Sequence, residues 1–449
     1  MHTRAQLPTA ATELLQKLEN RTAVIAILGL GYVGLPLMLA FDAAGFRTLG
    51  FDIDAEKLTL LREGRSYLNH LGNEVVAGLM KGGRCSLTAN EADLARADAL
   101  CLCVPTPITK TRDPDMSYVL NTAEMVSRNM RAGQIVVLES TTYPGTTDTD
   151  MAQILARSGL TNGIDYFIGY SPEREDPGNP DFSTRRIPKV VSGDDAAAAI
   201  LCHTLYSGIV EKVVPVSTTR TAEAVKLTEN IFRAVNIALV NELKVIFDKM
   251  GIDVWEVIDA AATKPFGFMP FYPGPGLGGH CIPIDPFYLS WKAREFGANA
   301  QFIELAGIIN SAMPRFVIEK LIHALSSAKQ KSVSGARVLL IGIAYKKNIN
   351  DMRESPSLVL MEELERLGAH VEFHDPHVPE IPMTREHAAL AGRRSVGLAP
   401  GVAGKFDVVL IATDHDAVDY GQLVRDASLV VDTRNRARGL GRDDIVFMA

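Results

Sequence analysis

The stretch AVIAILGLGYVG, Ala23 to Gly34, decides how the chain begins to fold. Its first half, AVIAIL, is a short apolar run of the kind that forms a parallel strand buried on both faces. Its second half matches G-x-G-x-x-G, with glycines at 29, 31 and 34. Gly29 permits a tight turn, Gly31 lets a pyrophosphate approach the backbone, and Gly34 lets the next helix pack closely on the strand. The stretch therefore predicts a strand, a phosphate-binding turn and a helix.

An acidic residue completes this pattern. The next strand-like run, TLGFDID, ends at Asp52. A carboxylate at this place accepts hydrogen bonds from both ribose hydroxyls, and its charge repels a 2′-phosphate. We therefore expect a domain that binds NAD in preference to NADP, with Tyr32 and Val33 of the glycine turn also against the cofactor. Lys57 on the following helix could reach the adenosine ribose, although a solvated lysine is an equal alternative.

The run from Ala23 to Phe41 contains no charged residue and is long enough to resemble a membrane helix. It carries three glycines and Pro36, however, and the acidic residues Glu13 and Glu19 precede it. A signal peptide would need a basic start directly before the apolar run. We therefore interpret the segment as a buried strand, a turn and the start of a buried helix.

Composition narrows the class of protein. A chain of 449 residues is too long for one hydrophobic core, so two or three domains are expected. Its 47% hydrophobic and 22% charged residues are typical of soluble globular proteins. A net charge of −7 without a long basic run disfavours nucleic acid as a partner. Five scattered cysteines favour a reducing, cytoplasmic setting, and no Cys or His spacing indicates a metal site.

Further strand-like runs continue the α/β pattern. Each starts apolar and ends polar: Ala97–Pro107, Gln134–Thr147 and Asp165–Arg174. In open α/β sheets ligands bind beyond the carboxyl ends of the strands. The polar residues at those ends are Thr106, Ser140 to Thr142, and Ser171 to Asp176. Cys101 and Cys103 alternate inside an apolar strand, so we expect them to pack in the core.

The spacing of apolar residues changes after Ser217 from a strand-like to a helical pattern. Residues 221–251 have apolar side chains at helical spacing, with Gly251 as the expected C-cap. At about 1.5 Å per residue this helix would run about 45 Å, long enough to be a spine between two domains. Lys226 and Asn230 are four residues apart and share one face. The alternative is a solvated lysine and a chance asparagine. A second helix is expected at about 300–324, then a linker at 330–335.

The last part of the chain, from Ala336, is again α/β, with four strand-like runs. Asp375 ends the second of them, but GIAYKKN follows the first where a G-x-G-x-x-G turn would stand. This part therefore resembles a nucleotide-binding fold without the dinucleotide pattern. It could bind a mononucleotide, with Lys346 and Arg353 meeting phosphates.

The stretch PGPGLGGHCIPIDPFYLSWK, Pro273 to Lys292, holds Cys281 in a run of glycines and prolines, between His280 and Asp285. A free cysteine is most often a small buried hydrophobe. A thiol on a rigid loop can also be a nucleophile. The residues alone leave both interpretations open.

Seven blocks, taken together, resemble the nucleotide-sugar 6-dehydrogenases of the UDP-glucose/GDP-mannose dehydrogenase superfamily, from about Ala23 to the C-terminus. They are GLGYVGLP, CVPTP, ESTTYPGTT, SPEREDPGN, KLTEN, PGPGLGGHCIPIDP and KKNINDMRESPS. SPEREDPGN and GGHCIPIDPFYL resemble the branch that acts on UDP-N-acetylhexosamines, above all UDP-N-acetylglucosamine 6-dehydrogenases. Ile284 stands where UDP-glucose enzymes typically carry a lysine, which puts that family contact in doubt here.

The resemblance implies an α/β fold with two Rossmann-like parallel-sheet domains joined by a central helical domain. The implied divisions are an N-terminal extension at 1–20 with a short surface helix, an NAD-binding domain at 21–218, a central domain with the cysteine loop at 219–329, and a UDP-sugar-binding domain at 330–449. It also implies a homodimer or higher oligomer and a place in surface polysaccharide synthesis such as O-antigen, with no nucleic acid or membrane partner.

The implied reaction is oxidation of a primary alcohol to a carboxylate with two NAD+. A first hydride leaves C6 and gives an aldehyde, which a thiolate captures as a thiohemiacetal. Loss of a second hydride gives a thioester, which water hydrolyses. By resemblance Cys281 is the nucleophile, and the glycines around it let the loop pass close to the sugar.

The resemblance carries over further residues to this site. The implied catalytic set is Cys281, Lys226, Asn230, Asp285, Glu173 and Thr141. Substrate contacts are implied for Glu173, Arg174, Lys226, Asn230, Tyr272, Gly278 and Lys346, and cofactor contacts for Thr106, Thr141 and Arg353. Thr142, Glu175 and Asp176 compete with their neighbours for these roles, and His280 is expected to pack in the loop.

Other readings of the sequence remain. The substrate could be UDP-glucose or UDP-N-acetylmannosamine. The chain could also be a two-electron dehydrogenase that needs no thiol, or a non-catalytic protein that binds NAD or UDP-sugar. Intact Cys281, Lys226, Asn230 and Asp285 argue against a silent binder.

Overall fold

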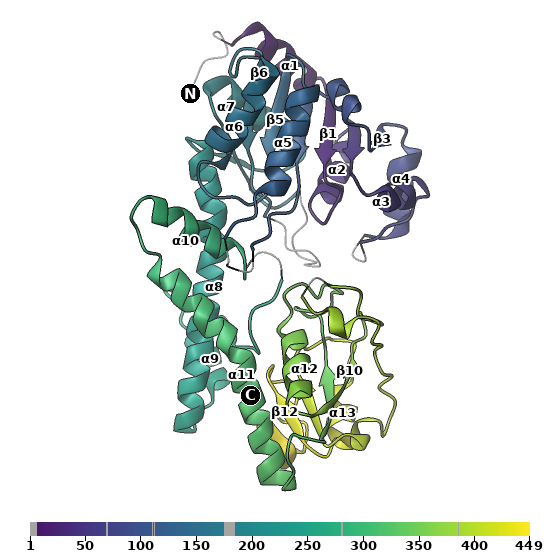
Figure 1. Cartoon of the computed structure of the whole chain (residues 1–449), viewed down its shortest axis with the longest axis vertical. Coiled ribbons are helices and arrows are strands. Elements are labelled where there is room, and N and C mark those ends of the chain that lie inside the picture. Colours follow the sequence, from purple (N-terminus) through teal and green to yellow (C-terminus); the bar gives the residue numbers. More distant parts are fainter. Residues whose placement is uncertain are drawn as a thin grey trace. The chain divides into compact units, whose positions relative to one another are not determined.

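The computed structural model describes residues 7–68, 71–109, 111, 113–174, 185–279, 282–384 and 386–449. The chain forms two compact units (Figure 1). The first consists of Met1–Glu229 and Phe287–Asn299, and the second of Asn230–Pro286 and Ala300–Ala449. Each unit contains an open α/β sheet, which confirms the expected fold class.

The first unit is built on an eight-stranded sheet of order β3-β2-β1-β4-β5-β6-β7-β8. All neighbouring strands are parallel except β6 and β7, which are antiparallel. The strands are β1 (Val24–Leu28), β2 (Arg47–Phe51), β3 (Cys85–Thr88), β4 (Ala99–Leu102), β5 (Gln134–Leu138), β6 (Tyr166–Tyr170), β7 (Lys189–Gly193) and β8 (Val213–Pro215). The helices are α1 (Thr9–Glu19), α2 (Gly34–Ala43), α3 (Ala55–Arg62), α4 (Asn73–Lys81), α5 (Ser117–Asn129), α6 (Ala152–Leu155) and α7 (Ala196–Ser207).

The register of this sheet brings the ends of four strands together. Leu28 pairs with Leu102, Leu102 with Leu138, and Leu138 with Tyr170. The residues that follow these strands therefore emerge side by side at one edge, which is where ligands bind in such sheets. The polar strand ends lie where the sequence predicted them. Strands β3, β7 and β8 were not predicted, because they are short or follow segments without a clear hydrophobic pattern.

Helix α1 corrects an expectation about the N-terminal extension. The expected short helix is present, but it is not a surface helix. Its residues Leu14, Leu15 and Leu18 are buried in the main core of the first unit, where α1 packs against α7. Lys17 also forms an ion pair with Asp98 at 2.8 Å. The helix is therefore part of the first unit's core.

Two long helices dominate the helical part of the second unit. Helix α8 (Thr219–Met250) begins in the first unit and continues into the second, and α11 covers Gln301–Lys329. Buried Asn241 on α8 donates to Asn310 on α11 at 2.9 Å, so a polar contact fixes their register. Helix α9 (Val254–Ala262) also belongs to the second unit, whereas α10 (Asp285–Glu295) begins in the second unit and continues into the first. Both expected long helices are present, and α11 extends beyond its expected end.

The second sheet has five parallel strands in the order β10-β9-β11-β12-β13. This is the other common doubly wound order, which also places ligands at the carboxyl ends of its strands. Four of its strands were expected from the sequence, and the short terminal strand β13 was missed. The elements are β9 (Arg337–Ile341), α12 (Pro356–Arg366), β10 (His370–His374), β11 (Val408–Ile411), α13 (Tyr420–Asp426), β12 (Val430–Asp432) and β13 (Val446–Met448).

Candidate active site

The glycine turn after β1 has the shape that a dinucleotide requires. Gly29 has a φ of 92°, and a Cβ there would lie 2.6 Å from the Cys103 carbonyl oxygen. A Cβ on Gly34 would lie 1.9 Å from the Gly29 oxygen, so α2 can start this close only with glycine. A Cβ on Gly31 would meet no atom within 4 Å, so the space beside the turn is open. Tyr32 and Val33 lie between these glycines, and the fit matches a pyrophosphate against the helix start.

Asp52 lies directly after β2 and is 6% exposed. One of its carboxylate oxygens accepts from the Leu30 amide at 2.9 Å, which fixes the glycine turn. The other accepts from the Asp54 amide at 2.9 Å. The Lys57 ammonium lies 3.5 Å from Asp52, so this lysine stands at the acidic residue. Tyr67 donates to the Leu30 carbonyl and was not anticipated, because no motif marks it.

The loop after β5 separates the two threonines that the sequence left in competition. Thr142 is fully buried, with its hydroxyl 3.5 Å from a Glu223 carboxylate oxygen. Thr141 is only partly buried, so of the two it can reach a ligand. Glu223, on α8, also accepts from the Gly145 amide at 2.7 Å and from the Thr147 amide at 2.9 Å. Thr106, after β4, is also buried at this edge of the sheet.

Lys226 is not a solvated lysine. Its side chain is 8% exposed, and its ammonium donates to the carbonyl oxygen of Glu173, just beyond β6. The structure thus brings together Lys226 and Glu173, two of the residues to which the resemblance gave active-site roles. Arg174 is engaged differently. It donates to the carboxylate of Glu229 on α8 at 2.6 Å and to the Pro188 carbonyl at 2.6 Å, which ties the loop to the helix.

Asn230 and Asp285 form a buried pair in the second unit. The Asn230 amide donates to the Asp285 carboxylate at 2.6 Å, and the two residues are 4% and 1% exposed. Asp285 is the first residue of α10, where a helix start favours negative charge. Lys226 and Asn230 lie one turn apart on α8, so they face the same side of that helix.

The glycine-rich loop before Cys281 packs against its own unit. A Cβ on Gly278 would lie 2.5 Å from the Cβ of Tyr345, and Gly279 has a φ of 87° with the Tyr345 ring beside it. The Gly279 amide donates to the Arg353 carbonyl at 2.9 Å. These two glycines therefore allow a close approach to the protein, a reason that the sequence analysis did not give. It expected them to make room for the sugar.

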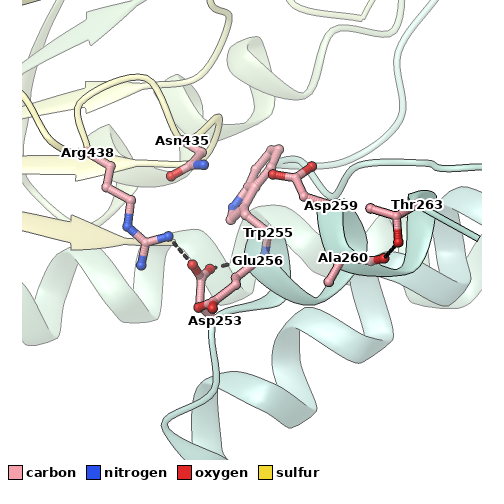
Figure 2. A pocket seen from close by; sticks show the side chains of 8 residues that line it. All are labelled: Asp253, Trp255, Glu256, Asp259, Ala260, Thr263, Asn435 and Arg438. Atoms are coloured by element: carbon pink, nitrogen blue, oxygen red, sulfur yellow. Dashed lines mark hydrogen bonds and ion pairs between the residues drawn. The ribbon is translucent and has the colours of Figure 1, made fainter.

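A pocket of about 520 Å³ lies in the second unit (Figure 2). It is lined by Asp253, Trp255, Glu256, Asp259, Ala260, Thr263, Asn435 and Arg438. Tyr272 stacks on Trp255 with ring centroids 5.3 Å apart and donates to Asp259 at 2.7 Å. None of the expected site residues lines this pocket, and Tyr272 is held at its border.

The loop after β9, which carries Lys346, is held by a buried cluster. Asp375 accepts from the Ile343 amide at 2.8 Å and contacts His415 Nε2 at 3.0 Å. His415 Nδ1 accepts from the Asn348 amide, so its proton lies on Nε2. Burial alone would raise the pKa of Asp375, but these donors outweigh burial and lower it. Asp375 therefore braces the loop.

Two arginines of the second unit, Arg353 and Arg434, are held by contacts within that unit. Arg353 makes a two-point ion pair with Asp351, with one contact at 2.6 Å. Arg434 follows β12 and donates to the Ala412 carbonyl at 2.8 Å, and its guanidinium would meet a Cβ on Gly274 at 2.6 Å. A guanidinium at the carboxyl ends of parallel strands suits a phosphate. No sequence motif marked Arg434.

The cysteines that the structure describes are poor nucleophiles. Cys101, Cys103 and Cys202 are buried, as expected for the first two, and burial raises the pKa of each thiol. Burial also raises the pKa of Cys85 to about 11. The fifth cysteine, Cys281, lies outside the described residues, as do His280, Glu175 and Asp176. No group of metal-binding side chains occurs in the described ranges.

Comparison with known proteins identifies the family. The NAD binding domain, the central domain and the UDP binding domain of the UDP-glucose/GDP-mannose dehydrogenase family match residues 23–210, 220–312 and 339–438. UDP-N-acetyl-D-glucosamine 6-dehydrogenase of Pseudomonas aeruginosa is 37% identical over 87% of this chain and 90% of its own. UDP-N-acetyl-D-mannosamine dehydrogenase of Pyrococcus horikoshii is 33% identical over 94% of this chain and 100% of its own.

A solved structure agrees with these matches. The structure of UDP-D-ManNAc dehydrogenase from Pyrococcus horikoshii has a TM-score of 0.82 and 32% identity, and covers 92% of this chain and 95% of its own. The chain therefore belongs to the UDP-glucose/GDP-mannose dehydrogenase family and is an NAD-dependent UDP-sugar dehydrogenase. Within the described part of the chain, no helix is both long and apolar enough to span a membrane.

The first prediction concerns Asp52. Because its carboxylate stands where it would repel a 2′-phosphate, the enzyme should prefer NAD+ to NADP+ in kcat/KM. Asp52→Asn removes the charge and keeps one oxygen for the Leu30 amide, so it should shrink this preference by roughly tenfold or more. Asp54→Asn, two residues further along the sequence, is the matched control and should leave the ratio unchanged. Equal use of both cofactors by the unaltered enzyme would contradict the assignment.

The second prediction concerns Glu223. Burial raises its pKa from 4.5 to about 7, against the opposing hydrogen bonds from Thr147 and Gly145. The unfolded chain then releases this proton at lower pH than the folded one, so folding stability falls as pH rises from about 4.5 to about 7. At about 1.4 kcal/mol per pKa unit, the loss is up to roughly 3 kcal/mol.

Glu223→Gln cannot titrate and should lose less stability than the unaltered protein between about pH 5 and about pH 8. The measurement is the midpoint of thermal unfolding of both proteins at the two pH values. Parallel pH dependences of the two midpoints would contradict the raised pKa.

Proposed function

We propose that the protein oxidises the C6 hydroxyl of a UDP-N-acetylhexosamine, most closely UDP-N-acetylglucosamine, to the uronic acid with two NAD+. The observation that carries the proposal is the buried pair of Asn230 and Asp285, of which Asp285 follows Cys281 by four residues in the sequence. A buried carboxylate held by an amide at a helix start is a costly arrangement that a purely structural loop does not need.

The chemistry balances as a four-electron oxidation. The C6 alcohol loses a hydride to the first NAD+ and a proton to give the aldehyde. The Cys281 thiolate adds to the aldehyde carbon, and the resulting thiohemiacetal loses a second hydride and a proton to give a thioester. Water adds to the thioester, the carbon–sulfur bond breaks, and the thiolate is restored. Overall, the alcohol, two NAD+ and one water give the carboxylate, two NADH and three protons.

Each side chain of the proposed site has its own role in these steps. The Lys226 ammonium and the Asn230 amide stabilise the oxyanion that forms at C6 in each addition step. Asp285, held by Asn230, accepts a proton or positions water. Glu173 is the base for thioester hydrolysis, and Thr141 hydrogen-bonds the water or the cofactor. Lys226 anchors the Glu173 backbone directly, so the oxyanion donor and the base keep a fixed relation.

The substrate assignment rests on two observations. The relative that is 37% identical is a UDP-N-acetyl-D-glucosamine 6-dehydrogenase, and Ile284 replaces the lysine that is typical of UDP-glucose enzymes. UDP-N-acetylmannosamine is the second candidate, because relatives at 33% identity act on that epimer by name. In the second unit, Lys346 and Arg434 are our candidates for binding the diphosphate.

We further propose that the enzyme works as a cytoplasmic homodimer that supplies uronic acids for surface polysaccharide. Phe232, Leu239 and Ile246 are exposed on α8 at intervals of seven residues, and Met250 extends the row. Apolar residues with a seven-residue repeat form a seam that pairs with a second helix of the same kind. A second copy of this chain offers such a helix.

The third prediction concerns Cys281. The unaltered enzyme should yield two NADH for each UDP-sugar, counted by absorbance at full conversion. Cys281→Ala removes the capture step, so at most one NADH per sugar should form. Cys85→Ala, which alters a thiol outside the proposed site, is the control and should keep the ratio of two. Two NADH per sugar from Cys281→Ala at an unchanged rate would refute covalent catalysis, and a ratio of one in the unaltered enzyme would indicate a two-electron dehydrogenase.

The fourth prediction concerns substrate class. UDP-N-acetylglucosamine should have a higher kcat/KM than UDP-glucose, because a site built for an acetamido group leaves polar atoms unpaired when the group is missing. We expect a preference of at least tenfold, measured with a panel of UDP-sugars at saturating NAD+. Ile284→Lys should reduce it by favouring UDP-glucose. A higher kcat/KM for UDP-glucose in the unaltered enzyme would overturn the assignment.

A further inference from the structure

A buried charged cluster lies behind the candidate base in the first unit. Lys189, the first residue of β7, has a side chain that is 8% exposed, and Glu139, directly after β5, is fully buried. The Lys189 ammonium donates to one oxygen of Glu139 at 2.6 Å. The Tyr206 hydroxyl from α7 donates to the other oxygen, and the ammonium also lies 5.1 Å from the Tyr206 ring centroid.

This cluster reaches the candidate base directly. The Lys189 ammonium lies 3.8 Å from the nearer carboxylate oxygen of Glu173 and 3.5 Å from the Pro172 carbonyl oxygen. Glu173 has a side chain that is 16% exposed, so it stands between the buried lysine and the edge of the sheet. Lys226 holds the Glu173 backbone carbonyl from the other side. Both the backbone and the side chain of Glu173 are therefore near an ammonium group.

The charges in the cluster depend on one another. Burial alone would lower the pKa of Lys189, but the carboxylates of Glu139 and Glu173 outweigh burial and raise it. Burial raises the pKa of Glu139, and the Lys189 ammonium opposes that rise. Among the described residues, the other groups that face the cluster are Tyr206, Cys101 and Cys103, whose pKa values burial raises, and the Lys226 ammonium at the Glu173 carbonyl.

We propose that Lys189 and Glu139 are positioning residues for thioester hydrolysis: the ammonium orients the Glu173 carboxylate, and Glu139 supplies the counter-charge that lets Glu173 take a proton. This inference rests on the proposed role of Glu173 as the base. When Glu173 removes a proton from the hydrolytic water, Lys189 remains paired with Glu139. The buried ammonium is then never without a carboxylate, which would be costly.

Replacing Lys189 and replacing Glu139 should have opposite effects on Glu173. Lys189→Met removes the positive charge beside Glu173, and Glu139 then holds a proton because burial disfavours its charge. Glu173 then loses the nearby positive charge that favours its ionised form, so it should act as a base only at higher pH. Glu139→Gln leaves Lys189 paired with Glu173 alone, so the ionised form of Glu173 should be favoured more strongly and the carboxylate should become a weaker base.

The test is the pH dependence of kcat for NADH formation, read together with the fraction of enzyme that carries a covalent sugar adduct by intact-protein mass. Lys189→Met should shift the acid limb of the profile upward by about one pH unit, and Glu139→Gln should shift it downward. Both variants should accumulate the adduct at neutral pH. Lys189→Arg keeps the charge and should retain the limb of the unaltered enzyme.

If Lys189→Met does not fold, the double variant Glu139→Gln/Lys189→Met removes both buried charges and should show the same upward shift. Acid limbs that coincide with that of the unaltered enzyme in both single variants, or in the double variant, would overturn the inference. Glu173→Gln distinguishes a failure of the positioning role of Lys189 and Glu139 from a failure of Glu173 as the base. If it slows adduct hydrolysis while the limbs coincide, only the positioning role is wrong, and if it leaves hydrolysis unchanged, the role of Glu173 falls and the inference falls with it.

Discussion

One face of helix α8 holds the segments on which the candidate active site depends. Glu223 accepts hydrogen bonds from the loop after β5, Lys226 donates to the Glu173 carbonyl after β6, and Asn230 donates to Asp285. These three residues are spaced by three and four positions, so they form one stripe on a helix. The contacts of Glu223 and Asn230 are buried, and that of Lys226 is partly buried. The helix is therefore the common reference for residues that are distant in the sequence.

Each of the two sheets has an aspartate directly after its second strand, and the two aspartates have different roles. Asp52 accepts from one amide of its glycine turn and from Asp54, and stands beside Lys57 at an open turn. Asp375 occupies the equivalent place after the second strand of the other sheet, but His415 and backbone amides of the loop after β9 surround it. The first arrangement leaves room for a dinucleotide, whereas in the second the carboxylate binds and stabilises the loop itself. This contrast explains why only the first sheet carries the glycine pattern.

The sequence predicted the features that depend on local patterns. The glycine turn, the strand ends and the long helix all have periodic or motif signals, and the structure places them as expected. Features that depend on distant partners could not be predicted. Nothing near Glu139 or Lys189 in the sequence indicates that they pair, because 50 residues separate them. Burial of α1 likewise depends on α7, which lies far along the chain, and β13 is too short to have a pattern of its own.

Our proposal gives catalytic roles to Lys226 and Asn230, which share one face of α8, and a one-residue insertion between them tests it directly. An alanine inserted after Thr228 would rotate everything beyond it by about 100° and move Asn230 off the face that carries Lys226. The variant should still bind NAD+, measured by calorimetry, because the glycine turn and Asp52 lie in the first unit. NADH formation from UDP-N-acetylglucosamine should fall by at least about a thousandfold. The same insertion after Met250, where the helix ends, should leave turnover within about threefold of the unaltered enzyme. Near-normal turnover by the Thr228 insertion would contradict the account.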